Sequence, residues 1–489
     1  MMSATDTPIL IVGSGGNGIG LAALLDAAGH REFRIITKHA DFGGAWFENM
    51  YPGCEVDNPS AVYEFEFHRN HGWTALFAKQ PELLAYFQDV ATVYGLYERT
   101  SFGVELLSAQ WSNDRMHWVV QTSQGPITTS MLILATGYLE EAVMPDVPGQ
   151  DEFRGPVFHS SQWPEGFTGD GLRVAVVGSG SSAIQIVPAL QPVAAEVLQF
   201  QRTPTWVLPK NNRQLPPEEI ALLQTSAAER QRRQEESLAE EEQNWAAIFL
   251  ALDEAKADEY QQIAMDYLTE SVADSEMRKV LLPAHRIGCK RPLVSDTYYP
   301  SLSASNVTLI PQGIVAMNEQ GVVASDGTSY PVDAVVMATG FYFGGHILHR
   351  IHRRDGQTIG SHQAGRPRAY KAMSTAQCPN LFLVGGAAPN GQIWNGLFPG
   401  QAAAPYIAGA IAYMQEQGFA AMEITEEAER RWKDDADQLL DRGPTVRGGC
   451  VNYSQDEEGR NKAAWPGSLA SMRQAYQRFD PTDYVKISR

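Results

Sequence analysis

Several things are scarce in this 489-residue sequence, and each scarcity narrows the kinds of protein it can encode. Cysteine occurs only four times, at Cys54, Cys289, Cys378 and Cys450, and no two form a C-x-x-C pair. This argues against a dithiol redox centre, a zinc ribbon and a secreted disulfide framework, and we expect no metal site. Positive charge is also short: 38 Lys and Arg against 57 Asp and Glu give a net charge of −19. Nucleic acid and membrane surfaces are therefore poor partners.

Long apolar runs are absent as well, so we expect no membrane-spanning helix. The opening "MMSATDTP" lacks the basic segment of a signal peptide, and we expect a cytoplasmic protein. The length corresponds to roughly three structural units. Much of the acid lies in "RQEESLAEEEQ", which is typical of a solvated helix face.

What is present is a pattern that occurs twice. A short apolar run precedes a glycine-rich turn and a helix-compatible segment in "PILIVGSGGNGIGLAALL" and again in "LRVAVVGSGSSAIQIV". The residues that define the two turns are Gly13, Gly15 and Gly18 in the first copy, and Gly178, Gly180, Ser181, Ser182 and Ala183 in the second. The first glycine of such a pattern makes a tight turn, the second lets the backbone approach a pyrophosphate, and the helix N-terminus offers free N–H groups. One copy alone is weak, but strand, helix and repetition together predict two dinucleotide sites.

Each copy is followed by a strand that ends in the same tripeptide, at Ala135–Gly137 and at Ala338–Gly340. We therefore expect an α/β fold with two Rossmann-like dinucleotide-binding domains. Residues 149–331 would form a second domain, inserted into a first domain that is split between 1–148 and 332–489. Within the inserted domain, the glycine-free stretch at about 213–285 predicts a helical excursion that serves as a lid or wall.

The second copy carries a basic residue where a Rossmann fold contacts its ribose, about 20 residues after the glycines. Arg202, in "LQFQRTP", offers a guanidinium suited to a 2′-phosphate, with Thr203 as a second donor. This favours NADPH over NADH, the alternative being an exposed arginine at a strand end. In the first copy Thr37 stands where an acid usually holds the ribose, so the way that ribose is held stays open.

Two further segments carry a resemblance. "GGAWFENMYPGCEVD" (43–57) resembles the pattern (A/G)-G-x-W-x-x-x-x-(F/Y)-P-(G/M)-x-x-x-D of the Baeyer–Villiger monooxygenases. "FRGPVFHSSQWP" (153–164) matches their F-x-G-x-x-x-H-x-x-x-W-(P/D) signature at every specified position. "VLQFQRTPTWVLP", "GCKRPLVSDTYYPSL" and "GRNKAAWPGS" also look like blocks of this family, so the resemblance covers nearly the whole chain. The chain is similar to the hydroxyacetophenone and cyclohexanone monooxygenases.

The resemblance implies FAD in the first domain, NADPH in the second, and a small ketone and O2 as substrates. In this family a C4a-peroxyflavin attacks the ketone, and one oxygen atom is inserted to give an ester or lactone. The peroxide must stay deprotonated, which a fixed cation favours. Arg291, in "GCKRP", matches the family's essential arginine, and Asp57 matches the carboxylate that holds it. Lys290 would reach the NADP 2′-phosphate together with Arg202.

The histidine signature is implied to be the joint that leads into the NADP domain. His159 would act there through hydrogen bonds, coupling domain rotation to flavin reduction, and not as a general base. Phe153 and Trp163 would pack the joint, and Gly155 would supply backbone freedom. Read without the family, a histidine between aromatic residues is usually structural.

The remaining cofactor contacts also follow the resemblance. Gly13, Gly15 and Gly18 would hold the FAD pyrophosphate, and residues along the rest of the flavin would be Gly44, Trp46, Asp57, Tyr63 and Leu106. The segment 379–414 would approach the isoalloxazine and start a helix near Gln401. Asn452 stands where relatives usually carry a tryptophan that helps cap the nicotinamide cofactor.

Two rivals remain open at this point. An N- or S-oxygenating flavin monooxygenase shares the fold and would not need Arg291. A flavin-dependent reductase or a nucleotide-binding scaffold is the more distant alternative, although the absence of C-x-x-C disfavours a disulfide reductase.

Overall fold

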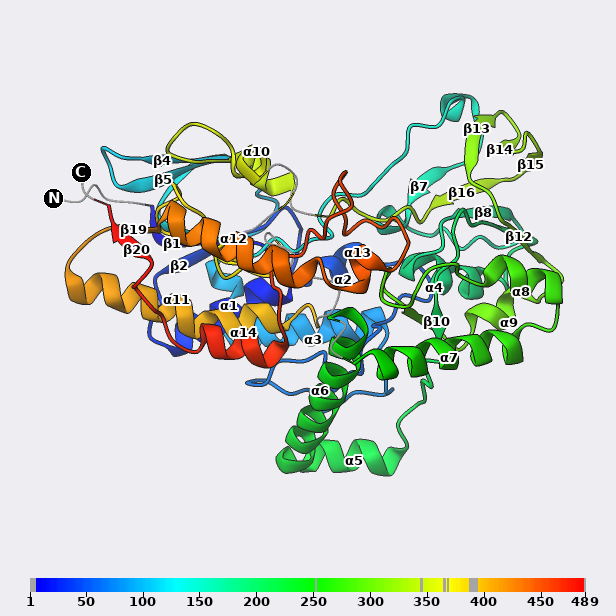
Figure 1. Ribbon diagram of the computed structural model, residues 1–489, viewed down its shortest axis with the longest axis horizontal. Coiled ribbons are helices and arrows are strands. Elements are labelled where there is room, and N and C mark those ends of the chain that lie inside the picture. Colours follow the sequence, from blue (N-terminus) through cyan, green and yellow to red (C-terminus); the bar gives the residue numbers. More distant parts are fainter. Residues whose placement is uncertain are drawn as a thin grey trace.

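The computed structural model describes residues 6–250, 253–343, 346–363, 366, 369–386 and 395–487. Two sheets lie in separate halves of the molecule, and a group of helices extends from the region where the halves meet (Figure 1). Each half has its own buried apolar core. The α/β architecture with two Rossmann-like units is confirmed: the first sheet is parallel around β1 and antiparallel from β4 to β6, and the second is wholly parallel.

The first sheet has the strand order β17-β4-β5-β6-β1-β2-β3, with β18 also paired to β6. Its strands are β1 (Thr7–Val12), β2 (Phe33–Ile36), β3 (Thr100–Ser101), β4 (Leu106–Ser112), β5 (His117–Thr122), β6 (Gly125–Leu134), β17 (Ile351–His352) and β18 (Leu381–Leu383). Val12 is in register with Ile36 of β2 and Leu134 of β6, both parallel neighbours. The carboxyl ends of these strands therefore meet beside Gly13, where open α/β sheets bind ligands.

Most helices of the first half and of the C-terminal segment lie around this sheet, while α13 lies against α6 (Figure 1). They are α1 (Gly16–Ala27), α2 (Ala45–Glu48), α3 (Gln80–Val93), α10 (Ile359–Gln363), α11 (Phe398–Gln417), α12 (Glu426–Leu440), α13 (Pro444–Arg447) and α14 (Leu469–Tyr476), and a hairpin pairs β19 (Met422–Ile424) with β20 (Tyr484–Lys486). α1 and α11 approach closely, since a Cβ on Gly400 would lie 2.5 Å from the Cα of Asn17. Asn17 also donates to the Gly396 carbonyl at 2.8 Å. The late helix is thereby fixed against the first glycine turn.

The second sheet is wholly parallel, with the order β12-β9-β8-β16-β7. Its strands are β7 (Val157–His159), β8 (Arg173–Val177), β9 (Glu196–Phe200), β12 (Val307–Ile310) and β16 (Ala334–Met337). The helices α4 (Ser181–Leu190) and α9 (Tyr298–Leu302), the antiparallel strands β13 (Ile314–Asn318), β14 (Gly321–Ala324) and β15 (Ser329–Pro331), and the pair β10 (Val207–Leu208) and β11 (Leu293–Val294) complete this half.

The position of β16 corrects one expected boundary. We expected the returning part of the first domain to begin at residue 332, but β16 pairs with β8 and β7 inside the second sheet. The second unit therefore continues through Met337. Its apolar sequence "AVVM" predicted a buried strand but could not say which of two similar sheets the strand would join.

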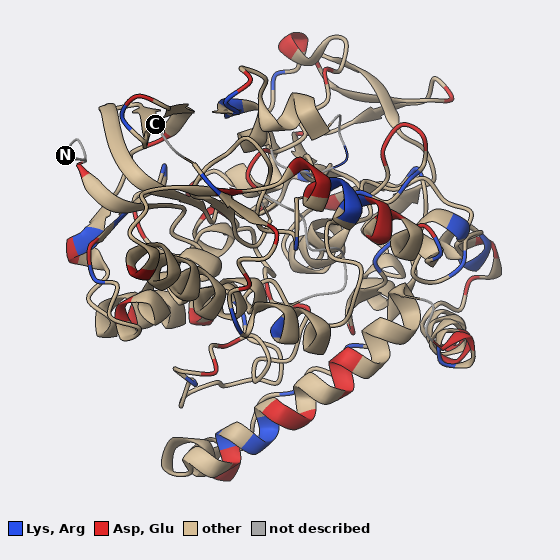
Figure 2. Cartoon of the chain, turned by 60° about the vertical axis from the view of Figure 1, so that its left-hand side comes forward, with Lys and Arg blue, Asp and Glu red and all other residues tan. Residues whose placement is uncertain are grey.

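The helical excursion consists of α5 (Pro217–Thr225), α6 (Ala227–Phe249), α7 (Glu254–Ser271) and α8 (Ser275–Leu281). Acidic and basic residues are interleaved along the projecting α6 at the bottom of Figure 2, and Arg232 pairs with both Glu229 and Glu236. Most of α6 is solvated, and only its C-terminal end and Gln234 are buried. Within the described ranges, the helices are too short or too polar to cross a bilayer.

The segment around His159 packs within the second half, where β7 pairs with β16. A Cβ on Gly155 would lie 2.1 Å from the Asp333 carbonyl oxygen, and its φ is not in the left-handed region. Gly155 is therefore required for close approach of two backbones, not for the conformational freedom that we expected. Phe153 is buried, and the Trp163 ring lies 5.2 Å from that of Phe158.

Candidate active site

The first glycine turn borders a cavity of about 340 Å³. Gly13 has a φ of +120°, and a Cβ there would lie 2.3 Å from the Ala135 carbonyl oxygen. A Cβ on Gly18 would lie 2.1 Å from the Gly13 carbonyl oxygen. Six of the residues predicted to bind the cofactor line this cavity: Gly13, Gly15, Gly44, Trp46, Tyr63 and Leu106. Glycine at both positions lets the backbone pack this closely, and the turn borders the cavity in which the pyrophosphate of FAD would lie.

At the position where a Rossmann fold usually has an acidic residue for the ribose, this chain has Thr37. Thr37 is buried, and its hydroxyl accepts a hydrogen bond from the Ser14 hydroxyl at 2.9 Å. Lys38 and Glu48 both line the cavity, and their charged groups are 3.2 Å apart. Glu48 belongs to α2, so the cavity gains a carboxylate from a segment that the Rossmann pattern does not cover.

The second glycine turn has the same geometry. A Cβ on Gly178 would lie 2.2 Å from the Ala338 carbonyl oxygen, whereas no atom lies within 4 Å of one on Gly180. α4 begins directly after Gly180, with Ser181 and Ser182 near the surface and Ala183 buried. The Ser179 hydroxyl donates to the Thr203 carbonyl at 2.8 Å, which fixes Arg202 and Thr203 beside this turn.

Two predicted cations come together near this second turn. Arg202 is exposed and Lys290 is partly buried. Burial lowers the pKa of Lys290, and the positive charge of Arg202 lowers it further. Two cations that repel each other at the edge of a dinucleotide turn fit an anionic ligand group such as a 2′-phosphate.

Arg291 and Asp57 form an ion pair across the two halves of the molecule. The Nη2 atom of Arg291 lies 3.0 Å from Oδ2 of Asp57, and its Nε donates to the same oxygen at 3.2 Å. The Arg291 side chain is 16% exposed and that of Asp57 is 35% exposed. Burial by itself would lower the pKa of Arg291, but the negative charge of Asp57 and its hydrogen bond to the guanidinium raise it above its ordinary value. The guanidinium therefore stays charged.

Aromatic side chains surround this pair. The guanidinium carbon of Arg291 lies 5.4 Å from the ring centroid of Trp245, which belongs to α6. The Trp46 indole donates to the Tyr63 hydroxyl at 3.0 Å. Tyr138 lies edge-on to Phe343 at 5.7 Å. A fixed cation with apolar rings around it stabilises negative charge more strongly than one in open water.

His159 lies at the end of β7, level with the end of β16. Its Nδ1 accepts from the Ser161 backbone N–H at 3.1 Å, so Nε2 carries the proton and donates to the Gly340 carbonyl at 3.0 Å. Burial lowers the pKa of His159, and the hydrogen bond to Gly340 only partly offsets this. A neutral imidazole with both ring nitrogens in hydrogen bonds is suited to holding the backbone around it and not to transferring protons.

Comparison with known proteins decides the family. Residues 10–238 match the family described as "Pyridine nucleotide-disulphide oxidoreductase". A Baeyer–Villiger monooxygenase of Streptomyces coelicolor is 34% identical over 97% of this chain and 92% of its own length. Another from Pseudomonas aeruginosa is 33% identical over 99% of this chain and 93% of its own length.

The chain belongs to the Baeyer–Villiger monooxygenase family.

Solved structures agree with this membership. The crystal structure of cyclohexanone monooxygenase from Rhodococcus sp. Phi1 bound to NADP+ is 26% identical, covers 100% of both chains and has a TM-score of 0.86. An oxidised steroid monooxygenase bound to NADP is also 26% identical, covers 99% of this chain and 100% of its own, and has a TM-score of 0.86.

In this Baeyer–Villiger monooxygenase the loop before Asp57 is held by an ion pair that the sequence did not reveal. The Lys210 side chain is 1% exposed, and its Nζ lies 2.5 Å from Oε1 of Glu55 and 2.8 Å from the Val56 carbonyl oxygen. Asp296 accepts hydrogen bonds from the backbone N–H groups of residues 210–212. The second unit thereby positions the segment that ends in Asp57. No sequence motif marks Lys210.

A second carboxyl group faces the Arg291–Asp57 pair. The Asn58 side-chain amide donates to both carboxyl oxygens of Glu241 at 2.9 Å. The pKa of Glu241 is raised to about 7, mainly by burial and also by the charge of Asp57, while the hydrogen bond from Asn58 and the charge of Arg291 oppose this rise. Glu241 lies in the acidic run that we expected to be a solvated face, but its side chain is partly buried, and Gln234 of the same run is fully buried.

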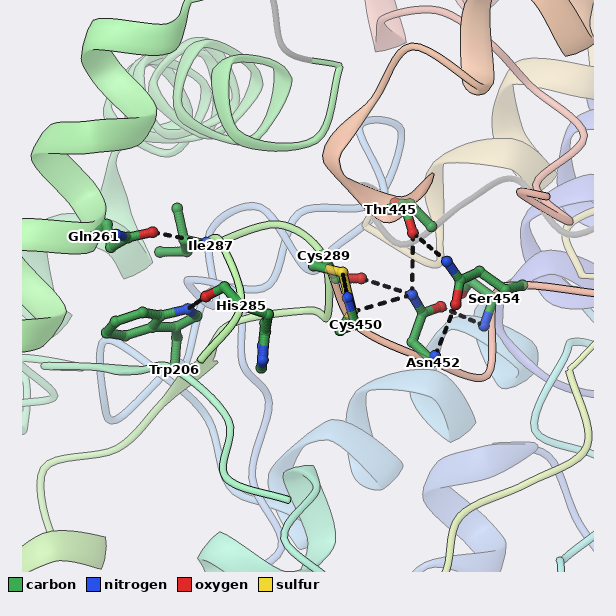
Figure 3. The surroundings of a disulfide bond; sticks show 10 residues. Trp206, Gln261, His285, Ile287, Cys289, Thr445, Cys450, Asn452 and Ser454 are labelled. Carbon is green, nitrogen blue, oxygen red and sulfur yellow. Dashed lines mark hydrogen bonds between the residues drawn. A yellow bond between two sulfur atoms is a disulfide. The ribbon is translucent and has the colours of Figure 1, made fainter. Parts of the chain in front are cut away.

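Cys289 and Cys450 are joined by a disulfide, with their Cα atoms 6.0 Å apart (Figure 3). Their separation of 161 residues along the chain gave no sign of this pairing, and the sequence showed only scattered cysteines. Asn452 donates to the Cys289 carbonyl at 2.8 Å and accepts from the Ser454 N–H at 2.8 Å. The side chain in the place of the family's tryptophan is therefore occupied in holding this loop.

Part of the late segment that we expected near the isoalloxazine, residues 387–394, lies outside the described residues. The helix that follows, α11, begins at Phe398, close to the expected Gln401. The Gln401 side chain accepts from the Glu66 backbone N–H at 3.2 Å, which ties α11 to the segment after Tyr63.

Proposed function

We propose that this chain uses FAD and NADPH to insert one oxygen atom of O2 next to the carbonyl group of a small ketone, giving an ester or lactone. The observation that carries the proposal is the Arg291–Asp57 ion pair, with 3.0 Å between its charged groups. It lies at the junction of the half that bears the first glycine turn with the half that bears the second. Bound FAD, once reduced by NADPH, supplies the chemistry that activates O2.

The role of Arg291 is to keep a positive charge beside the reacting oxygen. An arginine stays protonated at any working pH, whereas a lysine in a site of this exposure could lose its proton. Asp57 holds both Nε and Nη2, so the guanidinium plane is fixed before substrate arrives. A preorganised charge of this kind is commonly worth a factor of about 10²–10³ in rate.

Trp245 and Tyr138 have a different role, which is to limit water near the guanidinium. Trp245 reaches the pair from α6, so the helical excursion serves as a wall of the site. Excluding water strengthens electrostatic interactions inside the site and opposes the release of oxygen as hydrogen peroxide.

NADPH specificity is assigned to Arg202, Thr203 and Lys290 next to the second glycine turn. FAD is assigned to the cavity beside the first turn, with Gly13, Gly15 and Gly44 close to its phosphates and ribityl chain. His159 is assigned as a positioning residue of the joint, because both ring nitrogens are engaged with backbone or side-chain groups of the chain.

The N- or S-oxygenating alternative is disfavoured, because the full-length relatives named above are Baeyer–Villiger monooxygenases. Oxidation of a soft nucleophile also has no use for the Arg291–Asp57 pair. The test is to incubate the FAD-loaded enzyme with NADPH, air and a panel of linear, cyclic and aryl ketones, with a thioether in parallel, and to measure product mass. We expect an ester or lactone one oxygen heavier than its ketone. Sulfoxide as the sole product across a broad panel would contradict the proposal.

A further inference from the structure

The disulfide between Cys289 and Cys450 lies at the edge of the proposed active site. Cys289 comes two residues before Arg291, and Cys450 comes three residues before Tyr453. The bond therefore joins the loop that carries the essential arginine to the C-terminal segment 444–455 (Figure 3).

The two segments contact each other closely around this bond. The Arg286 N–H donates to the Gly448 carbonyl at 3.0 Å, and the Cys450 N–H lies 3.1 Å from Sγ of Cys289. A Cβ on Gly448 would lie 2.6 Å from the Cβ of Cys289. Asn452 closes the contact by donating to the Cys289 carbonyl. Displacement of either segment must therefore displace the other.

The far side of the arginine loop is held to the second unit. The Trp206 indole donates to the His285 carbonyl at 2.8 Å, and the Ile287 N–H donates to the Gln261 side chain at 3.0 Å (Figure 3). The disulfide adds the covalent link to the C-terminal segment. The loop is thus held by hydrogen bonds on one side and by a covalent bond on the other.

Tyr453 is the side chain through which this segment reaches the site. It is 50% exposed, its ring lies edge-on to Phe343 at 5.3 Å, and Phe343 in turn lies edge-on to Tyr138. Burial raises the pKa of Tyr453 to about 12, and the nearby positive charge of Arg291 opposes this rise. Asn452 is engaged in the loop, so Tyr453 is the aromatic residue that the segment offers to a cofactor or substrate beside the guanidinium.

We propose that the Cys289–Cys450 disulfide is a positioning link, which holds the loop of Arg291 and the segment of Tyr453 together at the site where the nicotinamide cofactor would bind, and which a dithiol reductant opens. This inference rests on the proposed function, because it names a control on the same site. The oxidised enzyme retains NADP+ and couples NADPH oxidation to ester formation. The reduced enzyme retains NADP+ less well and releases more hydrogen peroxide.

The solvent exposure of Cys289 and Cys450 decides which of the two sulfur atoms the reductant attacks. Cys450 is partly exposed and Cys289 is buried, so a thiolate of the reductant attacks Sγ of Cys450. The S–S bond breaks and Cys289 leaves as a thiolate, next to the positive charges of Lys290 and Arg291. The second thiol of the reductant then attacks the mixed disulfide, frees Cys450 and closes its own disulfide. Two electrons and two protons pass to the protein, and a small-molecule disulfide reverses the exchange.

The first measurement establishes the bond itself. The FAD-loaded protein is unfolded in denaturant and alkylated, and mass spectrometry should show two modified cysteines, Cys54 and Cys378, without reduction and four after treatment with dithiothreitol. Four modified cysteines in protein that was never reduced, or two after reduction, would overturn the proposal.

The second measurement follows the Kd for NADP+ and the hydrogen peroxide formed per NADPH oxidised, before reduction, after reduction and after re-oxidation with glutathione disulfide. If the state of the disulfide is coupled to NADP+ binding by a free energy of ordinary size, the Kd should rise at least about 5-fold on reduction. The peroxide share should rise with it, and both should return on re-oxidation. A Kd and a peroxide share that stay constant while the Tm falls would show a cross-link that only stabilises the fold, and would overturn the proposal.

Matched variants separate the link from general thiol chemistry. Cys450→Ser should show the reduced behaviour permanently and no response to dithiothreitol, and Cys289→Ala should do the same. Cys378→Ala removes a buried free thiol elsewhere and should keep the full response. If Cys289→Ala fails to fold, Cys450→Ser, whose side chain is partly exposed, still decides the question.

Failure of the proposed function would look different. An oxidised enzyme that gives no ester from any ketone would refute the oxygenation chemistry. The Kd for NADP+ would still rise or stay constant on reduction, and that result alone would decide whether the disulfide is a positioning link.

Discussion

The fixed charge of Arg291 depends on residues that are distant from it in the sequence. Asp57, 234 positions earlier, accepts from two of its nitrogens, and Trp245 covers its face. The pair could be anticipated only because both residues stand in motifs of a recognisable family. Glu241 could not, because its acidic run is typical of a solvated helix and nothing in the sequence separates it from Glu240.

Glu241 should make coupling depend on pH. The pKa of Glu241, raised mainly by burial to about 7, means that the carboxyl is neutral below that pH and carries a second negative charge near Asp57 above it. This charge opposes Arg291, so ester formed per NADPH should decline as the pH rises through about 7. We expect an effect of up to about tenfold, which corresponds to about 1.4 kcal/mol.

The check is the pH profile of the ester-to-peroxide ratio in Glu241→Gln, which should lose this decline. Glu240→Gln changes the preceding, exposed acid and should keep the wild-type profile. Identical profiles for the wild type and Glu241→Gln would show that Glu241 does not act on the pair.

At the scale of elements, strand and helix types were predictable from local pattern. The apolar runs before each glycine turn became β1 and β8, and the glycine-free stretch became α5 to α8. Pairing was less predictable, because it depends on contacts between distant segments. β16 joined the second sheet instead of beginning the return to the first, and Gly155 proved to be required by a close approach to Asp333.

The loop between β10 and α5 gives a stability prediction at this scale. Lys210→Met would remove the ammonium group that pairs with Glu55 and leave the carboxylate without its buried cation. Breaking a buried ion pair commonly costs about 3–5 kcal/mol. We expect a loss of this order in the free energy of unfolding, measured by denaturant titration.

Arg213→Ala is the control for that measurement. Arg213 pairs with Glu219 in the same region, but its side chain is 50% exposed. An exposed pair is worth about 1 kcal/mol or less, so this variant should stay close to the wild type. A similar small loss for Lys210→Met would refute the structural role of the Lys210–Glu55 pair.

At the scale of the whole molecule, the proposed site exists only when both halves are assembled. The first half contributes Asp57, the second contributes Arg291 with its loop, and the excursion contributes Trp245. The sequence pointed to the first two through motifs. It did not reveal the disulfide, because 161 residues of chain separate the two cysteines and only the fold brings them together.

The preference for NADPH over NADH is assigned to residues of the second half. Arg202→Ala should raise the KM for NADPH about 10- to 100-fold, as expected for losing a hydrogen bond to a charged group worth about 1.5–3 kcal/mol. The KM for NADH should change little, because NADH lacks the 2′-phosphate. Arg154→Ala removes another exposed arginine of the same half and should change neither value. An equal rise for both cofactors in Arg202→Ala would contradict the assignment.

The most direct test of the account is the product balance of Arg291→Ala, with Arg286→Ala as a control from the same loop. For a ketone that the wild type converts, we measure ester and hydrogen peroxide formed per NADPH oxidised. Arg291→Ala should still oxidise NADPH and release hydrogen peroxide, while ester formation falls by at least about 10²-fold. Arg286, which pairs with Asp258 and is 39% exposed, should be replaceable with the ester yield retained. Ester formation by Arg291→Ala at a rate close to that of the wild type would contradict the account.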